Sequence, residues 1–131
     1  MVIRATLATR AEAVADIAKD ARVSADTYVV GQGDEVELLY GVSVFARRPG
    51  PRDVLERFVE APAYLEVTVG VVRAAGFSVL PTGANPDHFD VQLVSGRTES
   101  QPASEQDVAA AAARLVRVAG DLLPNPFYAG S

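Results

Sequence analysis

His88 is the side chain of this sequence best suited to acid–base chemistry near neutral pH. It is the single histidine of the 131 residues, and imidazole is the side chain whose unperturbed pKa lies closest to neutrality. Residues 86–90 read Pro-Asp-His-Phe-Asp, where a strand is expected to begin. With its ring oriented by Asp87 or Asp90 and with Tyr40 nearby, His88 could act as a general base. The alternative is a histidine at the edge of a turn that only hydrogen-bonds the loop.

Arginines follow a long β-type segment and could supply a pocket for an anion. A guanidinium binds a phosphodiester or a carboxylate through a planar fork of N–H donors, and a turn with polar side chains comes just before the histidine. The candidate ligand-binding residues are Arg47, Arg48, Arg52, Thr82 and Asn85. Together with the histidine they would resemble in composition a metal-independent nuclease or a small transferase. The alternative is a solvated strand end.

No metal or cofactor is expected. The sequence has no cysteine, which excludes thiolate zinc sites, disulfides and cysteine nucleophiles. Asp87 and His88 are adjacent, so on a strand their side chains point to opposite faces. The glycines of Gly31-Gln32-Gly33 are followed by Asp34-Glu35, two carboxylates that would repel phosphate, and so indicate a hairpin turn rather than a nucleotide-binding loop.

Charge and hydropathy narrow the class of partner. The chain has 12 basic and 17 acidic residues, a formal net charge of -5. A protein that binds nucleic acid by neutralising many backbone phosphates usually has a basic surface, so nucleic-acid binding is not favoured for this chain. The longest mostly apolar stretch, 67–72, is far shorter than a membrane span, and the N-terminus lacks the features of a signal peptide. We therefore expect a cytoplasmic protein without membrane contact. Abundant Ala, Val, Gly and Arg are typical of a GC-rich bacterial genome.

The elements that must position these side chains follow from periodicity, caps and turn residues. Residues 64–75 fit either a helix, which we favour, or a strand. The expected elements are a strand over 2–8, a helix over 9–23, a β-hairpin over 27–46, a helix from 51 to about 59, a helix over 64–75, strands over 77–80 and 89–93, and a final helix from 104.

This order predicts an α+β fold in a single domain over 1–123, with a short C-terminal tail over 124–131. Its first six elements have the βαββαβ order of ferredoxin-like folds, with an antiparallel or mixed sheet. An additional strand and a C-terminal helix follow. Another mixed α+β sheet is the alternative.

The final helix and the tail carry side chains suited to contacts with a partner. Ala109 and Ala112 belong to an alanine run that allows close packing, and the aromatic pair Phe127 and Tyr128 follows the helix. The alternative is that both only cover their own core. An acidic domain without a clear catalytic constellation is typical of a protein-interaction module: an inhibitor, an immunity-type protein or an accessory protein. We expect a protein partner, which could be basic, or a homodimer; the alternative is a small enzyme or ligand-binding protein with a pocket around the histidine and the arginines.

Overall fold

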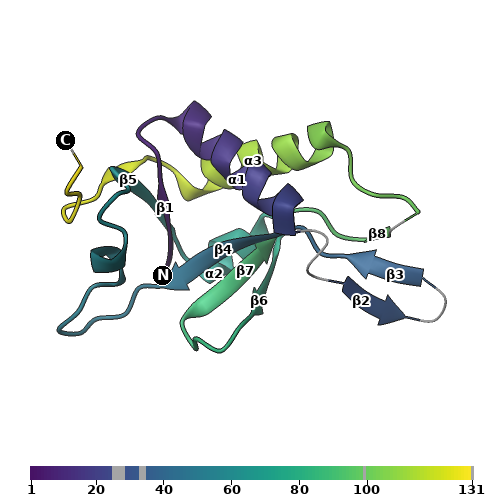
Figure 1. Ribbon diagram of the computed structural model, residues 1–131, viewed down its shortest axis with the longest axis horizontal. Helices are drawn as coiled ribbons and strands as arrows, with labels where there is room; N and C mark the ends of the chain where they lie inside the picture. The colour runs from purple at the N-terminus through teal and green to yellow at the C-terminus, as the bar shows by residue number, and fades with distance from the viewer. Residues whose placement is uncertain (25–28, 33–34, 99, 131) are drawn as a thin grey trace.

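Six strands form an antiparallel sheet in the order β6-β7-β4-β1-β5-β9 (Figure 1). The computed structural model describes residues 1–24, 29–32, 35–98 and 100–130. The strands of this sheet are β1 (Val2–Thr6), β4 (Gly41–Ala46), β5 (Ala63–Val67), β6 (Ser78–Pro81), β7 (His88–Gln92) and β9 (Leu123–Pro124).

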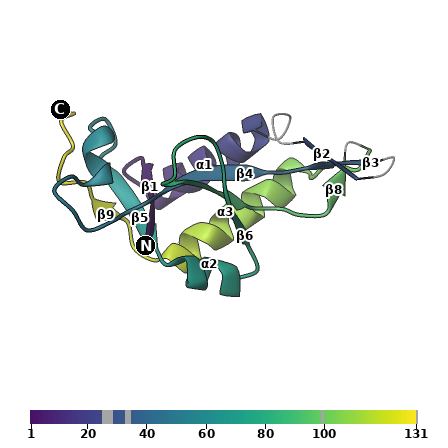
Figure 2. The ribbon, with the colours of Figure 1, turned by 90° about the horizontal axis from the view of Figure 1, so that it is seen from below.

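A smaller antiparallel sheet has the order β2-β3-β8. Its strands are β2 (Val29–Gln32), β3 (Glu35–Leu38) and β8 (Arg97–Thr98). Figure 2 shows it extending from the end of the molecule opposite to β5, β9 and the two termini. The hairpin expected over 27–46 is present only in its first part, where β2 pairs with β3. The long second run is divided, and its end, β4, pairs with β1 and β7 in the large sheet. Residues 27, 28, 33 and 34 of that expectation lie outside the described part.

The helices are α1 (Arg10–Ser24), α2 (Val69–Ala74) and α3 (Glu105–Ala119), with a short 3-10 helix η1 (Val54–Arg57). In Figure 1, α1 and α3 lie side by side, and α1 contacts β4 and β1 of the large sheet while α3 contacts β5. Their apolar sides, including Ile17 and Leu115, pack with Val42, Leu65 and Val91 of the strands into the main core. This burial of apolar area is the dominant stabilising contribution to the fold.

A second, smaller core lies on the opposite face of β1. Val2 belongs to the main core and Ile3 to the second one, because successive side chains of a strand alternate between faces. Leu55 of η1 and Tyr64 of β5 complete its buried part. Phe127, beyond β9, packs against the same cluster, so the C-terminal segment covers part of this face.

The structure confirms the α+β class, the antiparallel sheet and the C-terminal helix, and it changes two elements. The helix expected from 51 is only η1, because Asp53 begins it as N-cap and Phe58 ends it. The segment 64–75 is a strand and then a helix: β5 runs to Val67, and the Thr68 side chain accepts from the backbone N–H of Val71 to begin α2. Both patterns in that segment were present in the sequence, and a cap separates them.

Candidate functional site

A polar cluster lies on one face of β4 and β7. The register places Ser43 opposite Asp90 and Phe45 opposite His88, so these four side chains share a face. Thr82, just after β6, joins the cluster through the histidine ring. Of the residues singled out in the sequence, His88, Asp90 and Thr82 are thus brought together, with Ser43 as an additional member.

Both ring nitrogens of His88 are hydrogen-bonded. Nδ1 lies 2.8 Å from the Thr82 hydroxyl and 3.1 Å from the Thr82 carbonyl oxygen, and Nε2 lies 3.0 Å from the Ser43 hydroxyl. A carbonyl oxygen only accepts, which favours the tautomer with the proton on Nδ1. Nε2 then accepts from the Ser43 hydroxyl. This is the contact that a serine nucleophile makes with its general base.

The surroundings of Ser43 oppose acyl transfer. Its backbone N–H donates to Oδ2 of Asp20 at 3.3 Å, so this donor is engaged by a carboxylate and is not directed at a developing oxyanion. Asp90 Oδ1 lies 4.0 Å from Nε2 of His88, the nitrogen that faces Ser43, so it does not hold the opposite side of the ring. Asp90 is only 4% exposed, and its Oδ2 has no hydrogen-bond partner among the described residues.

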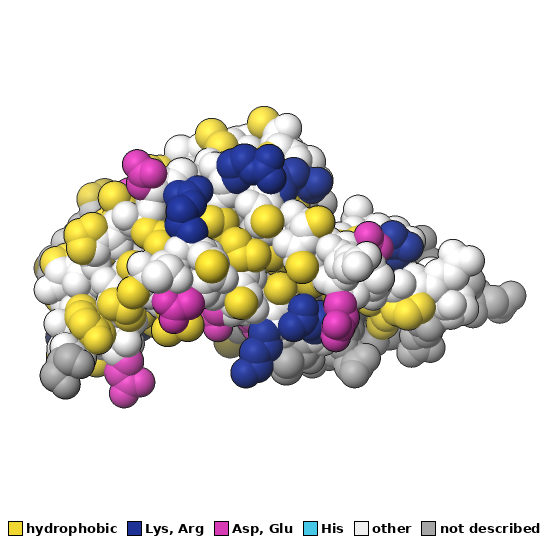
Figure 3. Space-filling model, turned by 90° about the horizontal axis from the view of Figure 1, so that it is seen from above, with side chains coloured by type: hydrophobic (Ala, Val, Ile, Leu, Met, Phe, Trp, Pro, Cys, Tyr) yellow, Lys and Arg dark blue, Asp and Glu magenta, His cyan; other side chains and the backbone are white. Residues whose placement is uncertain are grey.

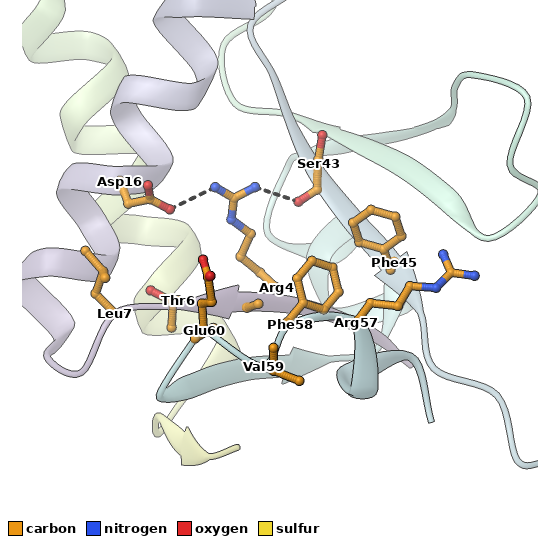
Figure 4. A pocket seen from close by; sticks show the side chains of 12 residues that line it. Arg4, Thr6, Leu7, Asp16, Ser43, Phe45, Arg57, Phe58, Val59 and Glu60 are labelled. Atoms are coloured by element: carbon orange, nitrogen blue, oxygen red, sulfur yellow. Dashed lines mark hydrogen bonds and ion pairs between the residues drawn. The ribbon is translucent and has the colours of Figure 1, made fainter. Parts of the chain in front are cut away.

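A hollow of about 570 Å³ adjoins this cluster (Figure 4). It opens where β1 and β4 separate, because their ladder has only the pairs Val2–Ala46 and Ile3–Phe45. Beyond them Arg4 reaches across the gap to the backbone carbonyl of Ser43. The residues that line the hollow are Arg4, Ala5, Thr6, Leu7, Asp16, Ser43, Phe45, Arg57, Phe58, Val59, Glu60 and Ala61.

The walls of the hollow are apolar and partly exposed. Leu7 is 46% exposed and Val59 41% exposed, and the rings of Phe45 and Phe58 are tilted with centroids 5.4 Å apart. Single exposed apolar side chains are ordinary, whereas apolar side chains that lie together at the surface are typical of interaction sites. Leu7, Val59, Phe45 and Phe58 all line the same hollow. Sequence analysis missed this site, because its parts come from four segments that only the tertiary fold brings together.

The arginines are divided between separate sites. The Arg47 guanidinium donates to Tyr64, Glu66 and Asp53. These bonds raise the pKa of Arg47, and the bond to Asp53 has the largest effect. The bond to Asp53 also lowers the pKa of the Asp53 carboxyl. Arg47 is therefore held in a structural network.

Arg48 pairs with Asp87 at 2.6 Å on the surface. Arg52 is exposed beside it, and both line a second hollow of about 430 Å³. Within the described residues, no arginine forms a hydrogen bond or ion pair with His88. Asn85 accepts from the N–H of Asp87 and so stabilises the turn before β7.

Tyr40 lies apart from the histidine cluster. Its side chain is buried in the main core, and its hydroxyl accepts from the backbone N–H of Ala103 at 3.0 Å. It anchors the segment before α3. The structure therefore leaves Tyr40 without a route to act on a group bound near His88.

The four candidate interface residues have different surroundings. Ala112 is fully buried in the main core, whereas Ala109 is exposed on α3. Phe127 is half-buried against the second core, and Tyr128 is exposed. Tyr128 lies near the hollow, because the N–H of the next residue, Ala129, donates to the carbonyl of Val59. Only Ala109 and Tyr128 remain well placed for contacts with another molecule.

The face formed by α1 and α3 carries charges of both signs. Figure 3 shows Lys and Arg side chains gathered along its upper part and again near its lower edge, where carboxylates lie beside them, with hydrophobic side chains between the two groups. The described residues contain no group of three or more His, Cys, Asp or Glu side chains placed to hold a metal ion. None of their helices is both long and apolar enough to span a bilayer.

Comparison with known proteins finds no relative of this chain. The chain matches no family model, no curated protein and no solved structure at a significant level. Its function is therefore argued from its own side chains.

Proposed function

We propose that this chain is a small protein-interaction module and that the hollow between β1, α1, β4 and residues 57–61 receives the partner. The observation that supports this most is the exposure of Leu7 and Val59 at the hollow, which Phe45 and Phe58 also line. Covering such apolar area on binding is favourable by about 25 cal/mol per Å² before the costs of association.

The composition of the hollow fits a protein surface better than a catalytic centre. The hollow is lined by aromatic and arginine side chains, which are enriched in protein interfaces, and also by carboxylates. A module of this kind would serve as an inhibitor, an immunity-type protein or an accessory protein in the bacterial cytoplasm. Its partner is another protein or a second copy of the chain.

Variants at the rim test this proposal. Random peptides displayed on phage are selected on the immobilised full chain, and the survivors are then measured against Val59→Asp. The matched control is Val71→Asp on α2, which introduces the same charge at a side chain that is 46% exposed but does not line the hollow. We expect the survivors to bind Val59→Asp at least about tenfold more weakly, because a carboxylate would be desolvated in the contact, and to bind Val71→Asp as they bind the wild type.

A second measurement asks whether the occupant is another copy of the chain. Light scattering that shows a dimer of the wild type and of Val71→Asp, but a monomer of Val59→Asp, supports the proposal with self-association as its form. A monomeric wild type whose selected peptides bind both variants equally well contradicts it.

The hydrogen bond between Ser43 and His88 supports a second candidate function, a small metal-independent enzyme or a ligand-binding protein. Ser43 lines the hollow, so a bound group could approach its hydroxyl. The test is labelling by a fluorophosphonate, which forms a bond to serine Oγ and expels fluoride. Labelling of the wild type, but not of Ser43→Ala or His88→Ala, would support this function; equal labelling of all three, or none, would contradict it.

A further inference from the structure

The hollow has an acidic end and a basic end with two aromatic rings between them. In Figure 4 the Glu60 carboxylate points toward Arg4 and Asp16, whereas the Arg57 guanidinium points away from them, past Phe45. The two ends can therefore be considered separately.

The acidic end keeps negative charge despite the arginine within it. Arg4 bonds to two carboxylates, Asp16 and Asp20, each at 2.9 Å, so this group carries a net charge of -1. Asp16 uses Oδ2 for Arg4, and its side chain remains 38% exposed. Glu60 is exposed and forms no hydrogen bond or ion pair with any described residue. Two carboxylates at this end can thus accept donors from outside the chain.

The rings beside these carboxylates suit a cation. Phe45 and Phe58 both line the hollow, and each is only half-buried, so part of each ring is accessible from outside. The face of an aromatic ring attracts an ammonium or guanidinium group. A side chain with an aliphatic stem and a cationic head matches apolar walls that lead to carboxylates.

We propose that the hollow receives an arginine or lysine side chain of the partner, with its stem against Phe58 and its charged head at Glu60 and Asp16. This inference rests on the proposed function and names the class of partner: a basic segment flanked by apolar residues. The net charge of -5 of the whole chain accelerates the encounter with such a segment.

The test uses the peptides selected on the full chain. Those whose binding depends on Val59 should contain arginine or lysine, and replacing that residue by glutamine should weaken binding. Glu60→Gln should weaken binding of the basic peptides roughly two- to fivefold, the upper part of the range for an exposed carboxylate–cation pair, because the contact with the aromatic ring remains. Glu56→Gln on η1 is the matched control, because it removes the same charge from an exposed glutamate outside this hollow; it should change binding less than twofold.

A double-mutant cycle separates direct contact from general attraction. With Glu60→Gln, replacing the basic residue of the peptide should cost much less than with the wild type. Equal effects of Glu60→Gln and Glu56→Gln would overturn the proposed contact. Peptides that depend on Val59 but contain no basic residue would overturn this inference and leave the proposed function standing, whereas peptides indifferent to Val59 would contradict the proposed function itself.

Discussion

The guanidinium of Arg4 donates to the backbone carbonyl oxygen of Ser43 at 3.0 Å, across the point where β1 and β4 cease to pair. The N–H of the same Ser43 donates to Asp20 of α1. Both backbone groups that lack a partner in β1 are thus satisfied by side chains, which a buried strand requires. The sheet can therefore open at this point, and the opening forms the hollow.

Replacing Arg4 by methionine should destabilise the fold by about 2–3 kcal/mol, because two carboxylates and a carbonyl would lose their donor in a partly buried place. The Arg4 side chain is 17% exposed. The control is Arg97→Met, whose ion pair with Asp107 is more exposed and should contribute less than about 1 kcal/mol. Urea denaturation near neutral pH measures both free energies of unfolding. Similar losses in the two variants would contradict a structural role for the Arg4 network.

Gly41→Ala should destabilise the protein by about 1–2 kcal/mol through overpacking. A Cβ at this position would lie 3.1 Å from Oδ2 and 3.2 Å from Cβ of Asp90, so the buried carboxylate would have to move. Gly50→Ala is the control, because no heavy atom lies within 4 Å of its Cβ position; its effect should stay within about 0.5 kcal/mol. Thermal unfolding of the double variant Gly41→Ala/Asp90→Ala should show a smaller loss than the sum of the single variants. Additive losses would rule out this contact as the cause.

Signals carried by a few neighbouring residues predicted the structure well. Thr9 begins the helix expected from residue 9: the N–H of Glu12 donates to the Thr9 hydroxyl, which in turn donates to the Glu12 carboxylate. Ser104 begins α3 through a similar bond, and Gly76 with φ of 96° follows α2. Each of these features depends on residues within one helical turn, and such a pattern is visible in a sequence.

The candidate site depends on placement that the sequence does not contain. Nothing in the sequence around Arg4 indicates a bridge, but the separation of β1 and β4 makes it a partly buried link to Ser43 and Asp16. Ser43 lacks any motif of a reactive serine, and only the pairing of β4 with β7 brings it to His88. The sequence grouped Arg47 with the histidine, whereas the strand exit directs it to Asp53 and Glu66. Proximity across strands decides such sites.

Asn125→Ala should destabilise the protein by about 2–4 kcal/mol and loosen the C-terminal segment. The Nδ2 group donates to the carbonyls of Phe58 and Ala61, and Oδ1 accepts from the N–H of Phe127. Asn125 is buried, so alanine would remove the side-chain partners of the Ala61 carbonyl and the Phe127 N–H. The Phe58 carbonyl would keep the N–H of Ala61 as its donor. The variant should show a lower urea midpoint and faster hydrogen exchange at the Phe127 amide.

The control for this substitution is Asn85→Ala, which removes one acceptor in the turn before β7 and should cost less than about 1 kcal/mol. Unchanged exchange at the Phe127 amide in Asn125→Ala would show that other contacts hold the C-terminal segment.

The ion pair between Arg47 and Asp53 should make stability fall in acid. Their hydrogen bond lowers the pKa of Asp53 below its ordinary value, so the folded state binds a proton at this carboxyl less readily than the unfolded state. The stabilisation is fully present above about pH 4 and is lost as the pH falls through the lower pKa of the folded state.

Asp53→Asn tests this effect without removing the cap of η1, because the Asn side-chain oxygen can still accept from the N–H of Leu55 as Asp53 Oδ1 does. At pH 7 the variant should be less stable than the wild type by about 1–2 kcal/mol, the contribution of a hydrogen bond between charged groups. The difference should shrink below about pH 4, because the unfolded wild-type chain then binds a proton at Asp53 that the folded state binds less readily. Urea midpoints of both proteins at pH 7 and pH 3 measure this convergence. If the difference in stability between the two proteins stays constant between pH 7 and pH 3, the acid sensitivity comes from other carboxylates. Only titration of Asp53 itself can make the two stabilities converge.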